Sequence, residues 1–294
     1  MDIRVLRYFL AVAQTENISH AAELLHLTQP TLSRQLRELE QELGKDLFHR
    51  GGRRITLTEE GLLLRQRAAE IVELVDKAAA EVRDAGETVA GDVYLGGGET
   101  EAMALIARTA KALRAAHPQV RFHLYSGNAD DVMARLDKGL LDFALIIQPF
   151  DSSKYDGIPL PHADRWGVLL RRDHPLAAKA SVTPKDLQTQ PLILSNQSMT
   201  IHGLAGWLGR DLNALPVAAT YNLIYNASLM VAEGVGCALA LDKLVSTGPD
   251  SPLCFRPLDP PLEAGLELVW KRGAAFSKPA AKFLELLKET ITKS

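Results

Sequence analysis

Residues 19–43 read SHAAELLHLTQPTLSRQLRELEQEL, and this stretch holds two helical patterns separated by residues 27–29. We expect Ser19 to cap the first helix and Thr28 to cap the second, because hydroxyl side chains accept hydrogen bonds from the free N–H groups of a first helical turn. Pro30 then falls in the first turn of the second helix, where its missing N–H is harmless. The stretch therefore predicts two short helices joined by a tight turn.

The second of these helices has one apolar and one polar face. Its leucines recur at spacings of four, three and four, so they share a narrow arc: Leu32, Leu36, Leu39 and Leu43. Its other positions include a set of candidate DNA contacts: Gln29, Pro30, Thr31, Ser33, Arg34 and Arg37. Gln29 can bond adenine and Arg34 can pair with guanine, which suits a recognition helix in the major groove. The alternative is an amphipathic hairpin whose polar face is simply solvated.

The charge of the chain limits how it can bind a polyanion. The 294 residues allow roughly two or three domains, and the net charge of −3 argues against attraction of the whole molecule to nucleic acid. Residues 1–60 carry eight Lys and Arg against nine Asp and Glu, and only residues 28–58 lean positive, with six against four. DNA binding would therefore depend on the local placement of arginines, and we expect one copy alone to bind weakly.

A glycine pair follows the second helix. Gly51 and Gly52 lie between short extended pieces, which predicts a hairpin with a tight turn. Three arginines flank the pair: Arg50, Arg53 and Arg54. Beside a recognition helix, such a hairpin is typical of a wing that grips phosphates or enters the minor groove, whereas taken alone it is an ordinary basic turn.

A long helix is predicted after the hairpin, with Thr58 as its cap and Glu59 and Glu60 near its positive end. Apolar residues then alternate at spacings of four and three: Leu64, Ala68, Ile71, Val75, Ala78 and Val82. The helix would be roughly 28 residues or about 42 Å long. We favour a dimerising seam over packing within one domain, because a symmetric dimer presents two recognition helices to a two-fold related site.

These stretches resemble the LysR-type transcriptional regulators. The resemblance is carried by AAELLHLTQPTLSRQLRELEQELGKDLFHR at residues 21–50 and by LTEEG at residues 57–61, and it covers the first ninety residues densely. It implies base-proximal roles for Gln29, Pro30, Thr31, Ser33 and Arg34, phosphate and wing contacts for Arg37, Arg50 and Arg53, and a linker-helix start at Thr58 and Gly61.

Strand-like and helix-like segments alternate beyond residue 91, which predicts an α/β fold of parallel sheets with helices on both faces. The resemblance implies two lobes joined by two crossovers, as in type II periplasmic binding proteins, with a small-molecule site in the cleft. We expect a winged helix-turn-helix domain at residues 1–58, a linker helix and hinge at 59–90, and an effector domain at 91–294. Its first lobe would span about 91–162 and 266–294, and its second about 163–265.

The candidate effector contacts are polar residues near the expected cleft: Gly98, Glu99, Thr100, Ser126, Asn128, Gln148, Asn196, Gln197, Ser198, Thr200 and His202. Gly96, Gly97 and Gly98 expose backbone N–H groups, which favours a polar or anionic ligand, or else form a tight turn. The resemblance implies that Thr100 donates a hydroxyl to the effector. Gly98 and Ala129 stand where the family commonly has hydroxyls, and Glu99 would disfavour the aromatic carboxylates that many relatives bind.

The prediction is therefore a sequence-specific DNA-binding transcriptional regulator controlled by a small-molecule effector. Its expected partners are double-stranded DNA, the effector and itself, as a homodimer or homotetramer. The alternative is a cytoplasmic solute-binding module of a transport or sensing system. An enzyme is disfavoured because the eight histidines show no metal-ligand spacing and the chain has no G-x-S-x-G motif. No cofactor and no metal are expected.

A cytoplasmic location without a membrane partner is expected. The apolar run at residues 9–13 is too short for a signal peptide, and no segment approaches the roughly 20 apolar residues that span a bilayer. Cys237 and Cys254 lie in apolar surroundings, so we interpret them as reduced core thiols rather than as a disulfide or a redox sensor.

Overall fold

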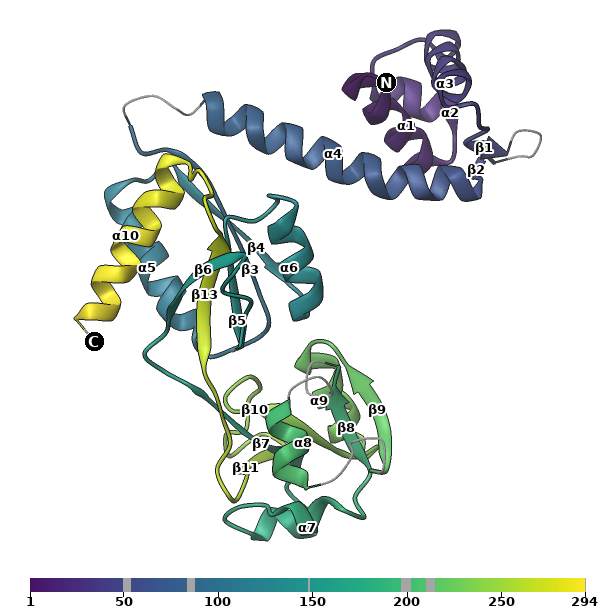
Figure 1. Cartoon of the computed structure of the whole chain (residues 1–294). Helices are drawn as coiled ribbons and strands as arrows, with labels where there is room; N and C mark the ends of the chain where they lie inside the picture. Colours follow the sequence, from purple (N-terminus) through teal and green to yellow (C-terminus); the bar gives the residue numbers. More distant parts are fainter. Residues whose placement is uncertain (50–53, 84–87, 148, 197–201, 210–214, 294) are drawn as a thin grey trace. The chain divides into compact units, whose positions relative to one another are not determined.

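The computed structural model describes residues 1–49, 54–83, 88–147, 149–196, 202–209 and 215–293, with only the backbone at 202 and 203. Contacts among these residues divide the chain into two units, Met1–Arg83 and Asp84–Ser294 (Figure 1). Each unit has hydrophobic clusters of its own, so each is a folded body with its own interior.

The first unit begins with three helices, α1 (Ile3–Thr15), α2 (Ile18–Leu24) and α3 (Gln29–Leu43). They share one apolar core, whose helical members are Leu6, Phe9, Val12, Ala21, Ala22, Leu32, Leu36 and Leu39. The small alanines of α2 let the backbones of the helices approach closely. Leu43 departs from the predicted stripe: it is 41% exposed, because α3 ends there and Gly44 turns the chain with φ +66°.

Of the two predicted helix caps, the one on α3 is confirmed and the one on α2 is wrong. Thr28 caps α3, and its side chain accepts from the N–H of Thr31, with Pro30 in the first turn as predicted. Ser19 does not cap α2. Asn17 does, and its Oδ1 accepts from the N–H groups of Ser19 and His20 at 2.9 and 3.1 Å. Helix α2 therefore begins at Ile18, two residues earlier than a Ser19 cap allows.

A short hairpin and a long helix complete the first unit. Strand β1 (Phe48–His49) pairs antiparallel with β2 (Thr56–Leu57), and the helix is α4 (Glu59–Arg83). Thr58 caps α4 as predicted, since its Oγ1 accepts from the N–H of Gly61 at 3.0 Å. A Cβ at Gly61 would lie 2.1 Å from the carbonyl oxygen of Leu47. The glycine therefore lets the first turn of α4 pack directly on the backbone that precedes the hairpin.

The second unit contains two lobes, each a sheet with helices on both faces. The first lobe has the strand order β4-β3-β5-β13-β6. Its strands are β3 (Gly91–Gly97), β4 (Val120–Ser126), β5 (Phe143–Ile147), β6 (Tyr155–Pro159) and β13 (Leu266–Lys271). Helices α5 (Met103–Ala116) and α10 (Lys278–Thr292) pack on one face, and α6 (Ala129–Asp137) packs on the other (Figure 1).

The second lobe has the strand order β11-β7-β10-β8-β9, with β12 also paired to β7. Its strands are β7 (Asp164–Arg171), β8 (Leu192–Ser195), β9 (Val217–Tyr221), β10 (Cys237–Leu241), β11 (Leu253–Pro257) and β12 (Glu263–Ala264). Helix α9 (Ile224–Ala232) packs on one face. The 3₁₀ helix η1 (Pro175–Ala178) and the helices α7 (Pro184–Leu187) and α8 (His202–Leu208) pack on the other.

The predicted α/β class is confirmed. The expected parallel pairing holds for β3 with β4 and β5 and for β8 with β9 and β10, but both sheets are mixed rather than parallel throughout. Strand β13 runs antiparallel to both β5 and β6, and β7 runs antiparallel to both β10 and β11. The chain crosses from one lobe to the other before β7 and again before β13. A strand that arrives from the neighbouring lobe enters its sheet from the opposite end. It is therefore antiparallel to strands of that sheet that are joined to one another through helices. Strands β6, β11 and β12 were not predicted.

Candidate functional site

The polar edge of α3 is open to solvent in the first unit. Gln29, Pro30, Arg34 and Arg37 are exposed, and Thr31 and Ser33 are partly exposed. The side-chain amide of Gln29 donates to the Ser33 hydroxyl at 3.1 Å, and Arg34 lies 3.6 Å from Glu38 across one helical turn. An exposed ion pair of this kind contributes little stability. The Arg34 guanidinium, whose side chain is 71% exposed, is thus held only weakly.

The predicted wing is described only in part. Arg54 is exposed and lies 3.6 Å from Glu16, the residue that ends α1. Arg50 and Arg53, with the predicted Gly51-Gly52 turn, lie outside the described residues. The short β1–β2 pair therefore presents one described arginine beside the helical bundle.

Helix α4 has one face turned to its own domain and one that is open. Ala68 is fully buried in the core of the first unit, and Leu64 and Val72 pack against the same core. Arg7 of α1 donates to both carboxylate oxygens of Asp76 on α4, one of the two bonds at 3.0 Å. This corrects the expectation that the whole apolar stripe of α4 is a dimerising seam. Leu64 and Ala68, at its start, pack within their own domain instead.

The second part of the α4 stripe remains exposed. Ile71, Val75 and Val82 are 39, 40 and 76% exposed, Ala78 is exposed, and Leu74 beside them is 42% exposed. A helix that leaves a row of aliphatic side chains in water offers a surface for another apolar surface to cover.

The cleft of the second unit contains a cavity of about 600 Å³ whose wall comes from both lobes. Most of its wall is apolar: Val132, Leu145, Ile146, Ile147, Pro149, Trp166, Leu241, Leu244, Leu262 and Leu266. Gly98, Glu99 and Thr100 also line it, as do Ser195, Tyr221 and Asn222 from the second lobe. This volume and this wall suit a small, largely apolar molecule.

Two predicted cleft residues connect the lobes directly. Glu99 Oε2 accepts from the backbone N–H of Ile224, the first residue of α9, at 2.5 Å. Thr100 is buried, and its hydroxyl donates to Asp164 Oδ2 at the start of β7. Burial raises the pKa of the Asp164 carboxyl, although the Thr100 hydroxyl bond acts in the opposite direction. The Thr100 hydroxyl is thus engaged within the chain in this structure.

Three described candidates for effector contacts do not line the cavity: Ser126, Asn128 and Asn196. Asn128 caps α6, with its Oδ1 accepting from the N–H of Asp131 at 2.8 Å, and Ser126 and Asn196 are exposed elsewhere. Gln148, Gln197, Ser198 and Thr200 lie outside the described residues, as does the side chain of His202. Ser195 precedes this last group and does line the cavity.

The glycines before Glu99 have a packing role. A Cβ at Gly96 would lie 2.4 Å from Leu141 and 2.9 Å from Val132, and one at Gly97 would lie 3.1 Å from the carbonyl oxygen of Leu145. They belong to strand β3, so of the three only Gly98 lines the cavity. The sequence did not reveal Trp166, Tyr221 or Leu262 as wall residues. The only signal was that Tyr221 and Asn222 join a strand to a helix.

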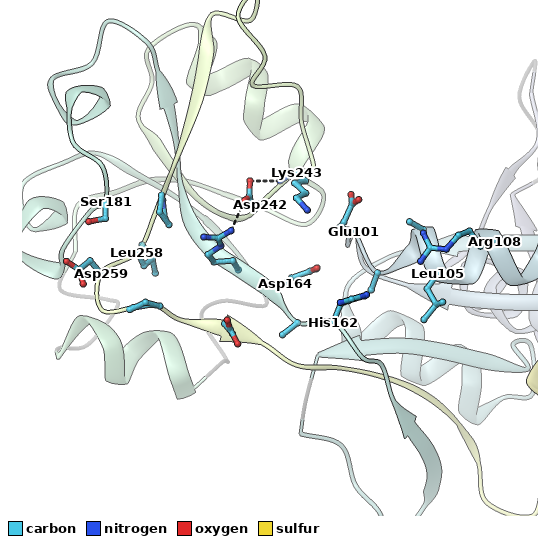
Figure 2. A pocket seen from close by; sticks show the side chains of 17 residues that line it. Glu101, Leu105, Arg108, His162, Asp164, Ser181, Asp242, Lys243, Leu258 and Asp259 are labelled. Carbon is cyan, nitrogen blue, oxygen red and sulfur yellow. Dashed lines mark hydrogen bonds and ion pairs between the residues drawn. The ribbon is translucent and has the colours of Figure 1, made fainter. Parts of the chain in front are cut away.

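A second, larger cavity of about 860 Å³ lies beside the crossovers and is strongly charged. Figure 2 shows Glu101, Arg108 and His162 on one side and Asp242, Lys243 and Asp259 on the other. Arg165 lies 4.0 Å from Asp242, so part of this charge is paired. Among the described residues, no group of three or more His, Cys, Asp and Glu side chains is arranged to hold a metal ion.

The two cysteines lie in the core of the second lobe. Cys237 and Cys254 are 2% and 3% exposed, and neither forms a disulfide. Burial raises the pKa of Cys237 to about 11. A thiol with such a pKa is almost entirely protonated near neutral pH and reacts slowly, because the thiolate is the nucleophile.

Comparison with known proteins gives the class of this chain. Residues 3–62 match the family model of the bacterial regulatory helix-turn-helix protein, lysR family, and residues 86–292 match the LysR substrate binding domain. The chain therefore belongs to the LysR family: it is a DNA-binding transcriptional regulator with an effector-binding domain, as predicted.

Individual relatives agree with this class. The chain is 30% identical to the DNA-binding transcriptional dual regulator OxyR of Escherichia coli strain K12 over 243 residues. This aligned region covers 81% of this chain and 78% of that protein. The chain is also 29% identical over 243 residues to the hydrogen peroxide-inducible genes activator of Pectobacterium carotovorum subsp. carotovorum, covering 81% and 79% of the two. The full-length CbnR structure with its target DNA shares the fold, with a TM-score of 0.75, 19% identity and coverage of 99% and 100%.

Proposed function

We propose that the exposed edge of α3 reads operator bases, with Gln29 and Arg34 at base edges and Arg37 on phosphate. Pro30, Thr31 and Ser33 complete this contact surface, and Arg50, Arg53 and Arg54 supply the wing. The observation that carries the proposal is the open polar edge of α3, backed by the buried Leu32, Leu36 and Leu39. Such an edge keeps guanidinium and amide groups in solvent, from which they can reach into a major groove.

The domain that binds DNA would span residues 1–58, followed by a linker at 59–90 and the effector domain at 91–294, with lobes divided near residues 162 and 266. The contacts of α4 favour extending the rigid N-terminal body to Arg83, because α4 shares its core with α1.

Two copies of the chain would pair through α4. Ile71, Val75, Ala78 and Val82, together with Leu74, form the exposed aliphatic row that a second α4 could cover. A two-fold pair presents two α3 helices to the two halves of an operator and doubles the number of arginines, which compensates for the weak charge of one copy. Leu64 and Ala68 belong to the interior of each domain instead.

The cleft cavity would hold the effector. Gly98, Glu99 and Thr100 face it from the first lobe, and Ser195, Tyr221 and Asn222 face it from the second. A ligand that contacts both lobes stabilises the arrangement that it fits best, and so shifts the populations of lobe arrangements. The regulator would work by binding rather than by catalysis, in the cytoplasm where its DNA lies. No helix of the described chain is long and apolar enough to cross a membrane.

Peroxide sensing through cysteine is disfavoured for this chain. One relative named above is described as an activator of hydrogen peroxide-inducible genes. Here both thiols are buried in the second lobe, and burial raises the pKa of Cys237. A sensor cysteine needs thiolate character and access to solvent, so we propose an effector that binds reversibly in the cleft.

A gel-shift experiment tests the proposed DNA contact. We expect the full chain to retard DNA from upstream of its own gene, and to do so in preference to scrambled DNA of the same length and composition. Gln29→Ala with Arg34→Ala should remove this preference. Binding that is equally strong on both DNAs, or no binding at low ionic strength, would refute the proposal.

A further inference from the structure

The N-terminus of α9 faces the cleft cavity and has no capping side chain of its own. Leu223 precedes the helix and makes no side-chain cap bond. The free N–H groups and the dipole of a helix N-terminus favour a negative group. Ile224, whose backbone N–H begins the helix, is itself part of the cavity wall. This is the place in the cleft where an anionic ligand would gain most.

Glu99 already occupies that place. It comes from the other lobe, directly after the glycines of β3, and its Oε2 accepts from the N–H of Ile224 at 2.5 Å. A carboxylate that accepts from a backbone N–H makes a charge-assisted hydrogen bond, which is stronger than a neutral one. The chain thus supplies its own anion to α9.

The rest of the described wall has no cationic side chain that would pair with a second anion. Among the described residues that line the cavity there is no Lys, Arg or His, whereas two are carboxylates, Glu99 and Glu263. A buried charge without a partner is costly. A ligand carboxylate would have to displace Glu99 from α9 or lie beside it without a cationic partner.

An apolar molecule without negative charge meets neither obstacle. It would contact Trp166, Leu145 and Leu262, and would gain from the removal of its apolar surface from water. The phenol of Tyr221 does not offer a free acidic proton to the ligand, because it donates to the carbonyl oxygen of Leu239 at 2.8 Å.

We infer that the cleft selects apolar effectors that carry no anionic group, and that Glu99 is the residue that sets this selectivity. The inference rests on the proposed role of the cleft as the effector site. Glu99 acts as a tethered carboxylate: it satisfies α9 from within the chain and repels a second anion from the same position.

Three probes that share a phenyl ring test this selectivity in the full-length protein: benzylamine, benzyl alcohol and benzoate. Calorimetric titration of the wild-type chain should show benzylamine and benzyl alcohol binding at least roughly tenfold more tightly than benzoate, since one lost charge-assisted bond is worth about that factor. In Glu99→Ala, the N–H of Ile224 becomes available to a ligand. Benzoate should then gain about tenfold, while benzylamine weakens.

Two further variants distinguish the effect of the Glu99 carboxylate from the effect of removing a negative charge elsewhere in the chain. Glu99→Gln keeps an oxygen that can accept from Ile224 but removes the charge, so benzoate should gain less than in Glu99→Ala. It also keeps the test valid if Glu99→Ala fails to fold. Glu101→Ala is the matched control, because Glu101 is exposed and lines the other cavity (Figure 2). It removes the same charge two residues away and should leave the order of the probes unchanged.

Each outcome decides between the inference and the function on which it rests. Benzoate that binds the wild-type chain as tightly as the other probes, or that gains nothing in Glu99→Ala, overturns the selectivity while the cleft remains the effector site. If none of the probes binds any variant while the protein still retards operator DNA, the effector role of the cleft fails, and the inference fails with it.

Discussion

The edge of α3 and the wall of the cleft have opposite chemistry within one chain. The α3 edge exposes Arg34 and Arg37, whereas the cavity wall carries Glu99 and Glu263 and, among its described residues, no cationic side chain. The net charge of −3 describes neither site. This difference teaches that the partner of each site follows from its local charge. The α3 edge suits a polyanion, and the cleft, by our inference, suits a molecule without negative charge.

The largest expected effect is the loss of operator affinity when the proposed dimer is broken, because only one α3 edge then contacts DNA. Ile71→Glu places a charge in the exposed aliphatic row of α4 and should convert dimers to monomers, as measured by sedimentation. Operator affinity should fall roughly a hundredfold to ten-thousandfold, because the second contact no longer benefits from the first. Ligand binding in the cleft should be retained, which would separate the two sites.

Gln66→Glu is the control for that variant. Gln66 is exposed on α4 but is not part of the aliphatic row, so the same charge there should leave both mass and affinity unchanged. A dimer that persists in Ile71→Glu would show that the chain associates through another surface.

The next effect concerns how α3 reads bases. Arg34→Ala should cost about 1–3 kcal/mol of binding free energy at one base pair and relax the preference there, because a bidentate contact to guanine is lost. Arg37→Ala, proposed to contact phosphate, should instead weaken all sequences about equally. Binding measurements on operators with single substitutions distinguish the two. A uniform loss with Arg34→Ala would assign that arginine to phosphate.

The smallest effect concerns the buried carboxyl between the lobes. Burial raises the pKa of Asp164 above its unfolded value, so the folded state prefers the protonated form and the ionised carboxylate costs stability. This cost is present above the folded pKa and disappears as pH falls below the unfolded value of about 3.9. Asp164→Asn, which can still accept from Thr100, should therefore raise the melting temperature at pH 7 by a few degrees at most.

The pH dependence is the decisive part of that measurement. The advantage of Asp164→Asn should shrink as pH is lowered from 7 towards 4. Asp250→Asn, at an exposed loop position, should change stability by less than about 0.5 kcal/mol at either pH. If the wild type is the more stable protein at pH 7, the Thr100–Asp164 bond outweighs the cost of burial.

The first unit was largely predictable because its signals are local. Thr28, Pro30 and the leucines of α3 lie within one helix, and their spacing alone sets which face is buried. The error at Ser19 arose because Asn17 is an equally good cap two residues earlier, and only the packing of α2 decides between them. Ala68 could not be assigned, since an aliphatic stripe does not say whether α1 or a second chain covers it.

The cleft was only partly predictable. Thr100 was predicted through the family resemblance, and Glu99 because it lies beside Thr100 at the expected cleft. Trp166, Tyr221 and Leu262 come from separate segments of the other lobe, and the crossovers that bring them to one wall leave no periodic signal. The same crossovers turn β7 and β13 antiparallel, which alternation of strands and helices could not reveal.

By itself the sequence determined the class of protein, the two helices of the DNA-reading motif and the residues on the exposed edge of the second. The class followed from the resemblance of residues 21–50 and 57–61 to the family. The helices and their exposed edge depend on spacings of three and four residues within a single helix, and such spacings act without the rest of the chain. The tertiary structure alone decided which part of α4 stays open, and that Glu99 accepts a hydrogen bond from Ile224. Those facts join residues far apart in the chain, and only folding brings their atoms within reach.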